Sequence, residues 1–227
     1  MKSQASTLVS WSSGKDSAWA LHLLQQSEEY KIVGLLTTLN SVFERVAMHS
    51  TRREVLEAQA AAAGLPLQVI PLPWPCSKRE YEAPCREPAT RQLFPVSRRL
   101  PSGISFWKIF ADTAKTVCGT GLTPLFPIWG VETRGLLREM IASGVKARIV
   151  CVDPKKMPGE FAGRDLDEAF LRELPAGMDP CGENGEFHTC VYDGPMFREA
   201  IPIESGEAVA RDGFVFADVR LMGCTAP

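Results

Sequence analysis

Apolar runs alternate with helical stretches in the first third of the chain, and this alternation limits the fold more than any other feature. Residues 7–11, 31–37 and 67–71 predict strands, and residues 16–26 predict the first helix. A capping box at residues 51–54 predicts the start of a second helix, which ends at Gly64. This β-α-β-α-β order implies parallel strands joined by right-handed crossovers.

The later chain continues the pattern and then changes character. Residues 131–143 predict a helix, residues 147–152 a strand and residues 165–173 a short helix. From His188 onward the sequence is typical of β structure, and Asp212-Gly213 is a strong hairpin signal. The predicted fold is therefore α/β, a doubly wound parallel sheet with a C-terminal β-rich part.

Composition narrows the classes of function. The net charge of −2 argues against a nucleic-acid partner, because such proteins usually carry a basic surplus. Residues 1–7 are polar and lack the apolar core of a signal peptide, and no apolar run approaches the roughly 20 residues that span a bilayer. We therefore expect no membrane association. The seven cysteines form no C-x-x-C pair, so we expect free thiols in the reducing environment of the cytoplasm.

The stretch WSSGKDSAW, residues 11–19, lies at the turn between the first predicted strand and helix. Gly14 lets backbone amides approach an anion, and the helix that follows points its positive end at the same place. Lys15 adds a compensating charge. Hydroxyl donors come from Ser12, Ser13 and Ser17. A capped turn with a chance lysine is the alternative, but the pattern favours a phosphate-binding loop.

Asp16 does not suit a phosphate site on its own, because its carboxylate would repel the ligand. It therefore indicates either a Mg²⁺ ion between the two groups or a helix cap. The spacing of the loop is not that of Walker-type nucleotidases.

A second stretch, GMDPCGENGEFHTCVYDGP at residues 177–195, gathers carboxylates in a loop rich in Gly and Pro. Glu183 and Glu186 flank Asn184 and Gly185, and His188 follows. Carboxylates there could hold a metal ion, orient an amine or act as a base, and His188 could titrate near neutrality. A solvated turn is an equally good interpretation of this stretch alone.

The two stretches together resemble one family, the ATP-binding domain family that includes diphthine–ammonia ligase, within the PP-loop ATP pyrophosphatases. Its members carry an S-G-G-K-D-S loop near the start and a G-E-x-G-E-[FY] loop near the end. Ser13 stands where that pattern has its first glycine. The form E-N-G-E-F-H-T is similar to the bacterial branch of the family. The likeness covers residues 7–83 and 119–197 and weakens after them.

The resemblance implies a sheet of the adenine-nucleotide α-hydrolase type, similar to a Rossmann fold, with an ATP-binding domain at residues 1–176 and an acceptor loop and β-rich part at 177–227. It implies a ligase that adenylates a carboxylate with ATP, releases pyrophosphate and forms an amide with ammonia or an amine. The loop residues from Ser12 to Ser17 would bind ATP, with Asp16 near Mg²⁺. Lys15, Glu183 and Glu186 would be catalytic.

The acceptor would lie against the second loop, whose expected contacts are Glu183, Asn184, Gly185, Glu186 and His188. His49 and Arg52 are weaker candidates. Two other functions stay open: an ATP- or AMP-binding protein without turnover, and a PP-loop enzyme that modifies tRNA. The absence of paired cysteines to carry sulfur and the mild acidity disfavour the second.

Residues 84–118 fit their surroundings badly. Four prolines between residues 84 and 101 forbid a long helix, and no clean apolar run supplies the strand expected here. Related sequences have that strand and then a G-D-[IL]-F-L-E-D-[IV]-R-x-Y-R-E motif, which this chain lacks. A shifted reading frame recovers it: the wobble base of Phe106 followed by the first two bases of Trp107 must encode Leu. The last base of Trp107 with the start of Lys108 must encode Glu. We therefore expect that residues from about 84 to 118 derive from a shifted frame.

Overall fold

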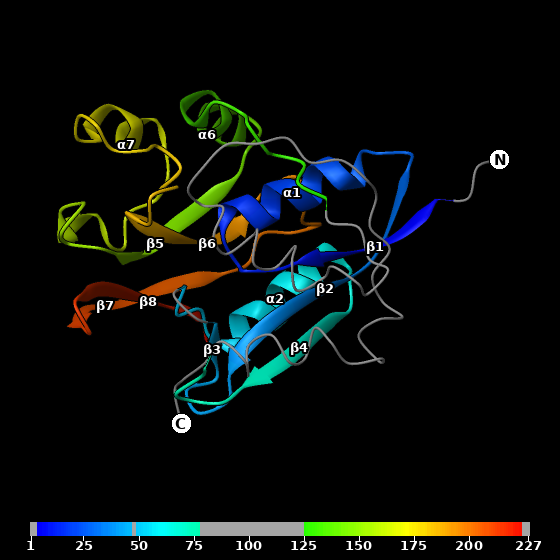
Figure 1. The fold of residues 1–227 in the computed structure, drawn as a ribbon, viewed down its shortest axis with the longest axis horizontal. Helices are drawn as coiled ribbons and strands as arrows, with labels where there is room; N and C mark the ends of the chain where they lie inside the picture. Colours follow the sequence, from blue (N-terminus) through cyan, green and yellow to red (C-terminus); the bar gives the residue numbers. More distant parts are fainter. Residues whose placement is uncertain (1–3, 47–48, 78–124, 224–227) are drawn as a thin grey trace.

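The computed structural model describes residues 4–46, 49–77 and 125–223. The suspected frame-shifted segment, residues 84–118, lies outside this part of the chain. The described residues form two sheets with helices packed between and around them (Figure 1).

The first sheet contains the parallel strands predicted from the N-terminal third. β2 (Tyr30–Asn40) lies between β1 (Ala5–Ser10) and β4 (Leu67–Leu72) and is parallel to both. A two-residue strand, β3 (Arg45–Val46), pairs antiparallel with the end of β2. Parallel pairing puts the carboxyl ends of β1, β2 and β4 at one edge, where α/β sheets bind ligands.

Two helices connect these strands. α1 (Lys15–Gln25) contacts β1, β2 and a later strand, β6 (Phe187–Asp193). α2 (Arg53–Ala63) contacts another later strand, β8 (Phe214–Leu221). Gly64, with φ of 67°, ends α2 in the left-handed conformation, as its position in the sequence predicts. The predicted capping box does not form, because Arg52 rather than Thr51 occupies the N-cap position and no side chain caps the helix.

The second sheet is antiparallel, with the order β6-β5-β8-β7. Its strands are β5 (Lys146–Val152), β6 (Phe187–Asp193), β7 (Ile203–Arg211) and β8 (Phe214–Leu221). α6 (Thr133–Ala142), a 3₁₀ turn η2 (Gly159–Phe161) and α7 (Glu168–Glu173) surround β5. In Figure 1, α6 and α7 lie on the opposite side of β5 from the β7–β8 hairpin.

The C-terminal β character and the hairpin are confirmed. Asp212 and Gly213 form the turn with φ of 52° and 83°, the conformation that the dipeptide predicts. β5 differs from expectation, because it pairs antiparallel with β6 and β8 instead of extending the parallel sheet. The described residues are therefore mixed α/β, with three parallel strands beside an antiparallel sheet.

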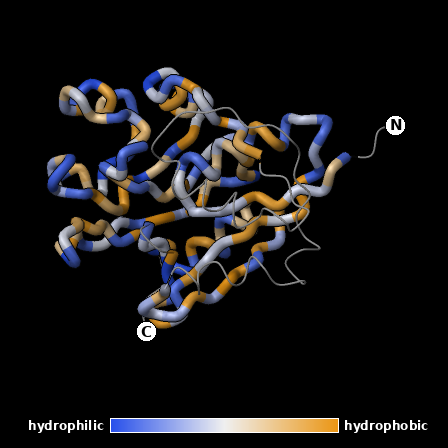
Figure 2. Tube along the Cα trace, in the orientation of Figure 1, coloured by the Kyte–Doolittle hydropathy of each residue, from blue (hydrophilic) through white to orange (hydrophobic). Residues whose placement is uncertain are grey.

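Both sheets share one hydrophobic core. Apolar side chains of β1, α1, β2, α6, β5 and β6 belong to one continuous buried cluster. Hydrophobic residues follow the strands and the inward helix faces, and hydrophilic residues collect at the outer turns (Figure 2). Cys151, Cys181 and Cys190 are free and buried, and Cys76 is free and half-buried. No described helix has the length and apolarity to cross a membrane.

A cluster of charges joins the end of the first sheet to the second. Asp218, on β8, accepts hydrogen bonds from Arg45 at 2.8 Å, from Arg52 at 2.8 Å and from Arg220 at 3.0 Å. Burial alone would raise the pKa of Asp218, but the guanidinium groups of Arg52, Arg45 and Arg220 outweigh it and hold the pKa well below its ordinary range. Arg52, a weak site candidate, is thus committed to this cluster.

Replacing Asp218 by Asn should destabilise the fold, since Arg45 on β3 and Arg52 at the start of α2 lose a partly buried anionic partner. We expect a loss of about 1–3 kcal/mol at pH 7, measured by urea unfolding. The depressed pKa means that this stabilisation is present above the ordinary value of 3.8 and is lost as the pH falls below it.

The difference between the wild type and Asp218→Asn should accordingly be constant from pH 7 to about pH 5 and shrink towards pH 3. Asp212→Asn is the matched control, because Asp212 is 83% exposed in a turn that also suits Asn. An equal loss of stability in both variants would contradict the assignment.

Candidate functional site

The predicted phosphate loop lies where β1 ends and α1 begins. Its serines organise it internally: Ser12 and Ser17 place their hydroxyl oxygens 3.1 Å apart, and the Ser17 hydroxyl donates to the carbonyl of Gly14 at 2.9 Å. The N–H groups of Asp16 and Ser17 lie in the first turn of α1, where a helix offers donors without intrahelical acceptors. The loop therefore retains amide donors for an anion.

Ser13 has a left-handed backbone with φ of 73° and is fully buried. This conformation suits glycine, the residue that the resembling family has there, and costs other residues free energy. The Ser13 hydroxyl donates to Cys190 Sγ at 3.4 Å and accepts from Gln59 Nε2 at 3.0 Å. The structure thus turns this hydroxyl into the protein, so it does not serve as the additional phosphate donor that the sequence indicated.

Gly14 is needed for space. Its φ of −88° is open to any residue, but a Cβ atom there would lie 2.7 Å from His49 Cε1 and 3.2 Å from the carbonyl oxygen of Thr189. His49 is itself fixed, because its Nδ1–H donates to the carbonyl of Thr189 at 2.9 Å. His49, a weak candidate from the sequence, therefore packs against Gly14 of the phosphate loop.

β6 holds the phosphate loop in place. The N–H of Val191 donates to the carbonyl of Ser13 at 2.9 Å, and the N–H of Lys15 donates to Thr189 Oγ1 at 3.1 Å. Lys15 and Thr189 are 174 residues apart in the chain. The two stretches that the sequence singled out are thus neighbours in space.

Lys15 is only 2% exposed. Its ammonium group donates to both carboxylate oxygens of Asp16 at 2.8 Å and lies 5.8 Å from the centre of the Phe187 ring. Burial alone would lower the pKa of Lys15, but the charges of Asp16 and Glu183 raise it above its ordinary value. Lys15 is therefore a permanent cation at the mouth of the loop.

Two acidic residues hold the second loop, residues 177–186, in shape immediately before β6. Asp179 accepts the N–H groups of Cys181 at 2.8 Å and Glu183 at 3.2 Å, and its other oxygen accepts the hydroxyl of Thr133 at 2.9 Å. Glu186 is 4% exposed and accepts the backbone N–H of Asn184 at 2.9 Å. The surroundings of Glu186 favour a role in holding the loop.

Asn184 completes this arrangement. The side-chain amide of Asn184 donates to Glu186 at 3.1 Å. Its backbone carbonyl accepts a hydrogen bond from the ammonium group of Lys156 at 2.7 Å. Gly185, with φ of 76°, forms the tight turn between them. These contacts explain why the loop has one shape and presents one particular carboxylate.

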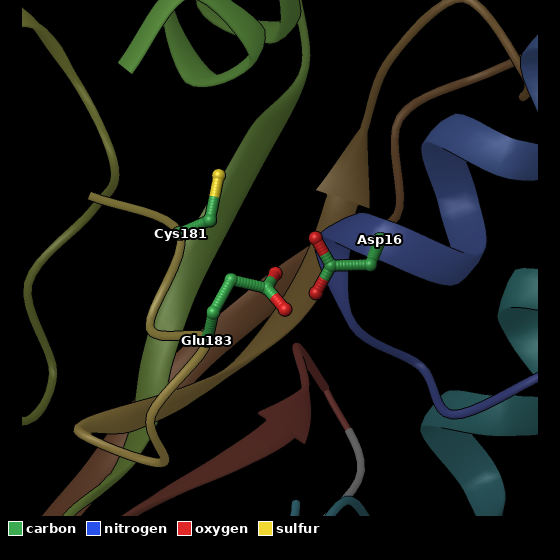
Figure 3. A group of neighbouring side chains, drawn as sticks. All are labelled: Asp16, Cys181 and Glu183. Carbon is green, nitrogen blue, oxygen red and sulfur yellow. The ribbon is translucent and has the colours of Figure 1, made fainter. Parts of the chain in front are cut away.

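That carboxylate is Glu183. Among the described residues no donor contacts its side chain, and it faces the carboxylate of Asp16 across the gap between the loop and α1 (Figure 3). Burial and the neighbouring charge of Asp16 raise the pKa of Glu183 to about 7. Glu183 is thus the group in this site that titrates near neutrality.

Asp16, Glu183 and Cys181 place one ligand atom each within 4.8 Å of one another. The two carboxylates fit Mg²⁺, which prefers oxygen ligands. Burial raises the pKa of the Cys181 thiol to about 12, and the thiol donates to the carbonyl of Thr133 at 3.3 Å. A protonated thiol is not a ligand for Mg²⁺, so the oxygen pair alone fits this ion.

His188 does not titrate near neutrality, contrary to the expectation from sequence. Burial, with the nearby His49 and Lys15, lowers its pKa to about 3. Its ring centre lies 4.8 Å from that of His49, whose pKa burial also lowers. Both imidazoles are neutral at physiological pH.

Sequence reasoning missed Gln59, Thr189 and Asp179. Gln59 carried a signal, because it is a polar residue on the apolar stripe of an alanine-rich helix. Asp179, before Pro180 in a glycine-rich stretch, is typical of a residue that accepts backbone N–H groups in a turn. Thr189 had no distinguishing signal inside an apolar strand.

The chain is similar to known proteins over part of its length. Residues 132–220 match the family described as the diphthamide synthase C-terminal domain. The chain is 37% identical to diphthine–ammonia ligase of Mus musculus over 130 residues, which is 53% of this chain and 49% of the relative. The human protein of the same name is 36% identical over the same shares.

A more distant relative, diphthine–ammonia ligase of Schizosaccharomyces pombe, is 28% identical over 46% of this chain and 18% of its own length. The chain spans about half the length of the mammalian relatives that it matches. The comparisons thus connect the second loop and the antiparallel sheet to the diphthamide synthase C-terminal domain, and about half of the chain to diphthine–ammonia ligases.

Proposed function

We propose that this protein is an ATP-dependent ligase. In the proposed reaction, a carboxylate oxygen of the acceptor attacks the α-phosphorus of ATP and pyrophosphate leaves. Ammonia or an amine then attacks the acyl carbon of the adenylate, and AMP leaves as the amide forms. The observation that carries the proposal is the direct contact of the phosphate loop with β6, the strand that follows the carboxylate-rich loop.

The phosphate loop supplies the groups that this reaction needs first. Lys15 would leave part of its bonding to Asp16 and donate to the phosphates, with the first amides of α1 beside it. Asp16 and Glu183 would hold Mg²⁺, which would neutralise phosphate charge and polarise the bond that breaks. The serines at positions 12 and 17 would keep the loop in shape.

The second loop would receive the acceptor and the amine. The matched relatives are named diphthine–ammonia ligase, so their acceptor is the carboxylate of diphthine and their amine is ammonia. We extend to this chain the class of reaction, an amide formed from a carboxylate, with diphthine as the first acceptor to test. The exposed turn at Asn184 would be the acceptor's side of the site.

The first test is pyrophosphate release from Mg-ATP in the presence of ammonium chloride and a diphthine peptide, followed by a panel of carboxylic acids. Lys15→Met should lower the rate by about 100-fold or more, because a preorganised cation next to the phosphates is removed. Lys31→Met, at an exposed position on β2, is the matched control and should keep the wild-type rate.

Each outcome has a definite meaning. Binding of Mg-ATP without pyrophosphate release for any acceptor would identify a nucleotide-binding protein without turnover. Absence of ATP binding by the wild type would refute the proposal altogether. Release stimulated by tRNA, and by no small carboxylate, would favour the tRNA-modifying alternative.

The raised pKa of Glu183 predicts a pH dependence. Since we assign Glu183 a role as a carboxylate, kcat/KM should rise with pH through about 7, where the group loses its proton. Glu183→Gln should be slow at every pH and lack this rise. A rate that falls as the pH increases through 7 in the wild type would instead make Glu183 a proton donor.

We also propose that the functional chain has the other reading frame between residues 84 and 118. Among the described residues β1 pairs only with β2, which leaves its second edge for another strand. Read in the shifted frame, the residues before the G-D-I-F-L-E-D motif are compatible with an apolar stretch, G-F-T-A-V-A-F, which their codons permit. That stretch would pair with β1 and complete a doubly wound parallel sheet of the bacterial-type branch.

Sequencing codons 80 to 122 from independent genomic DNA tests the frame directly. One base gained near codon 83 and one lost near codon 118, or the reverse, is the expected result. The restored chain should then unfold at a higher urea concentration than the present one, since an edge of β1 becomes paired and apolar area is buried. An unchanged gene sequence together with an equally stable restored chain would refute this proposal.

A further inference from the structure

Gln59 is a completely buried polar residue in the middle of α2. Every polar atom of its side chain is used. Its Oε1 accepts the indole N–H of Trp11 at 2.9 Å, and its Nε2 donates to the carbonyl of Val191 at 2.7 Å and to the Ser13 hydroxyl at 3.0 Å. The carbonyl of Ser13 lies 3.2 Å from the same nitrogen. One side chain thus joins the end of β1, the phosphate loop and β6.

These partners lie immediately before the residues that we assign to ATP. Trp11 is the first residue after β1, and Ser13 precedes Gly14 and Lys15. The carbonyl of Ser13 also accepts the N–H of Val191 at 2.9 Å. The direction in which the chain leaves Ser13 decides where the Lys15 amide and ammonium group lie.

The backbone of Ser13 needs such support. At φ of 73° the backbone conformation costs a serine more free energy than a glycine. Contacts with the surrounding residues must offset this cost. Gln59 contacts both the hydroxyl and the carbonyl of Ser13. Among the described residues, no other side chain hydrogen-bonds to both of these atoms of Ser13.

We infer that Gln59 is the positioning residue of the phosphate loop, holding Ser13 in the left-handed conformation so that Lys15 and the first amides of α1 face the phosphates of ATP. The inference rests on the proposed function, since ATP is the ligand of that loop. Gln59 is fully buried, so it would act on the nucleotide indirectly, through its two hydrogen bonds to Ser13. The serine at position 13 is therefore tolerated because Gln59 is present.

The test is the dissociation constant of Mg-ATP, measured by calorimetry on folded protein. Gln59→Leu keeps the volume of the side chain and removes its hydrogen bonds, and we expect at least tenfold weaker binding. Adding Ser13→Gly to that variant should recover most of the affinity, because glycine adopts a positive φ without support. Thermal stability should not recover, since the indole of Trp11 still lacks its acceptor.

Val55→Ala is the matched control. Val55 is a fully buried residue of the same helix and packs near Cys190, so its truncation lowers stability without touching Ser13. This variant should bind Mg-ATP with the wild-type constant. Equal weakening in Val55→Ala and Gln59→Leu would make the effect one of stability and overturn the inference.

A second variant covers the case in which Gln59→Leu does not fold. Gln59→Glu keeps an acceptor for Trp11, but when ionised it places a carboxylate beside the carbonyls of Ser13 and Val191. Relative to the wild type at the same pH, affinity should be low at pH 8 and closer to normal at pH 6, where a protonated carboxyl can again donate.

Several results contradict the inference. Wild-type affinity in Gln59→Glu at pH 8 would do so, as would failure of Ser13→Gly to restore binding to Gln59→Leu. If the wild type itself does not bind Mg-ATP, the proposed function fails, and this outcome is distinct from a wild type that binds while the Gln59 variants bind equally well.

Discussion

The contact between β6 and the phosphate loop is the constraint on which the rest of the site depends. Val191 bonds to the carbonyl of Ser13 and Thr189 to the amide of Lys15, while the carbonyl of Thr189 fixes His49 behind Gly14. β6 follows the second loop directly, so its position also sets that of Glu183. A strand of the antiparallel sheet thereby fixes the loop that follows β1 of the parallel sheet.

The acidic residues of the second loop have two different roles. Asp179 and Glu186 hold the loop in shape, and Glu183 is the carboxylate that faces Asp16. Asp179 and Glu186 are held by hydrogen bonds that they accept from backbone N–H groups and from the side chains of Thr133 and Asn184. Such charge-assisted bonds are short and strong, and they keep a loop of glycines and polar residues in a single shape. Within the part of the chain that the structure describes, no donor bonds to the carboxylate of Glu183, because its neighbours satisfy the loop without it. A cluster that looks uniform in sequence therefore contains residues with different roles.

The order of helices and strands was predictable, because the spacing of hydrophobic residues within each segment indicates its type. The three parallel strands, the stop at Gly64 and the turn at Asp212 and Gly213 all follow from near neighbours in the chain. The partners of β5 were not predictable, because an apolar strand can pair either way and only its packing decides. The low pKa of His188 and the raised pKa of Glu183 depend on residues far away in sequence, such as His49 and Asp16. The domain division at residue 176 stays a prediction.

The balance of charge in the site bears on how it can hold a nucleotide. Asp16 and Glu183 face one another with Lys15 as the buried cation beside them, and the only other described lysine at this loop, Lys156, is largely committed to Asn184 and Asp153. A triphosphate brings several further negative charges, which one ammonium group cannot offset at low dielectric. In the proposed function, a divalent cation held by Asp16 and Glu183 would offset part of this charge, and Lys15 would then be free to bind phosphate. On this proposal the acidic pair would be the protein's contribution to a metal site, and the phosphates would supply the remaining ligands.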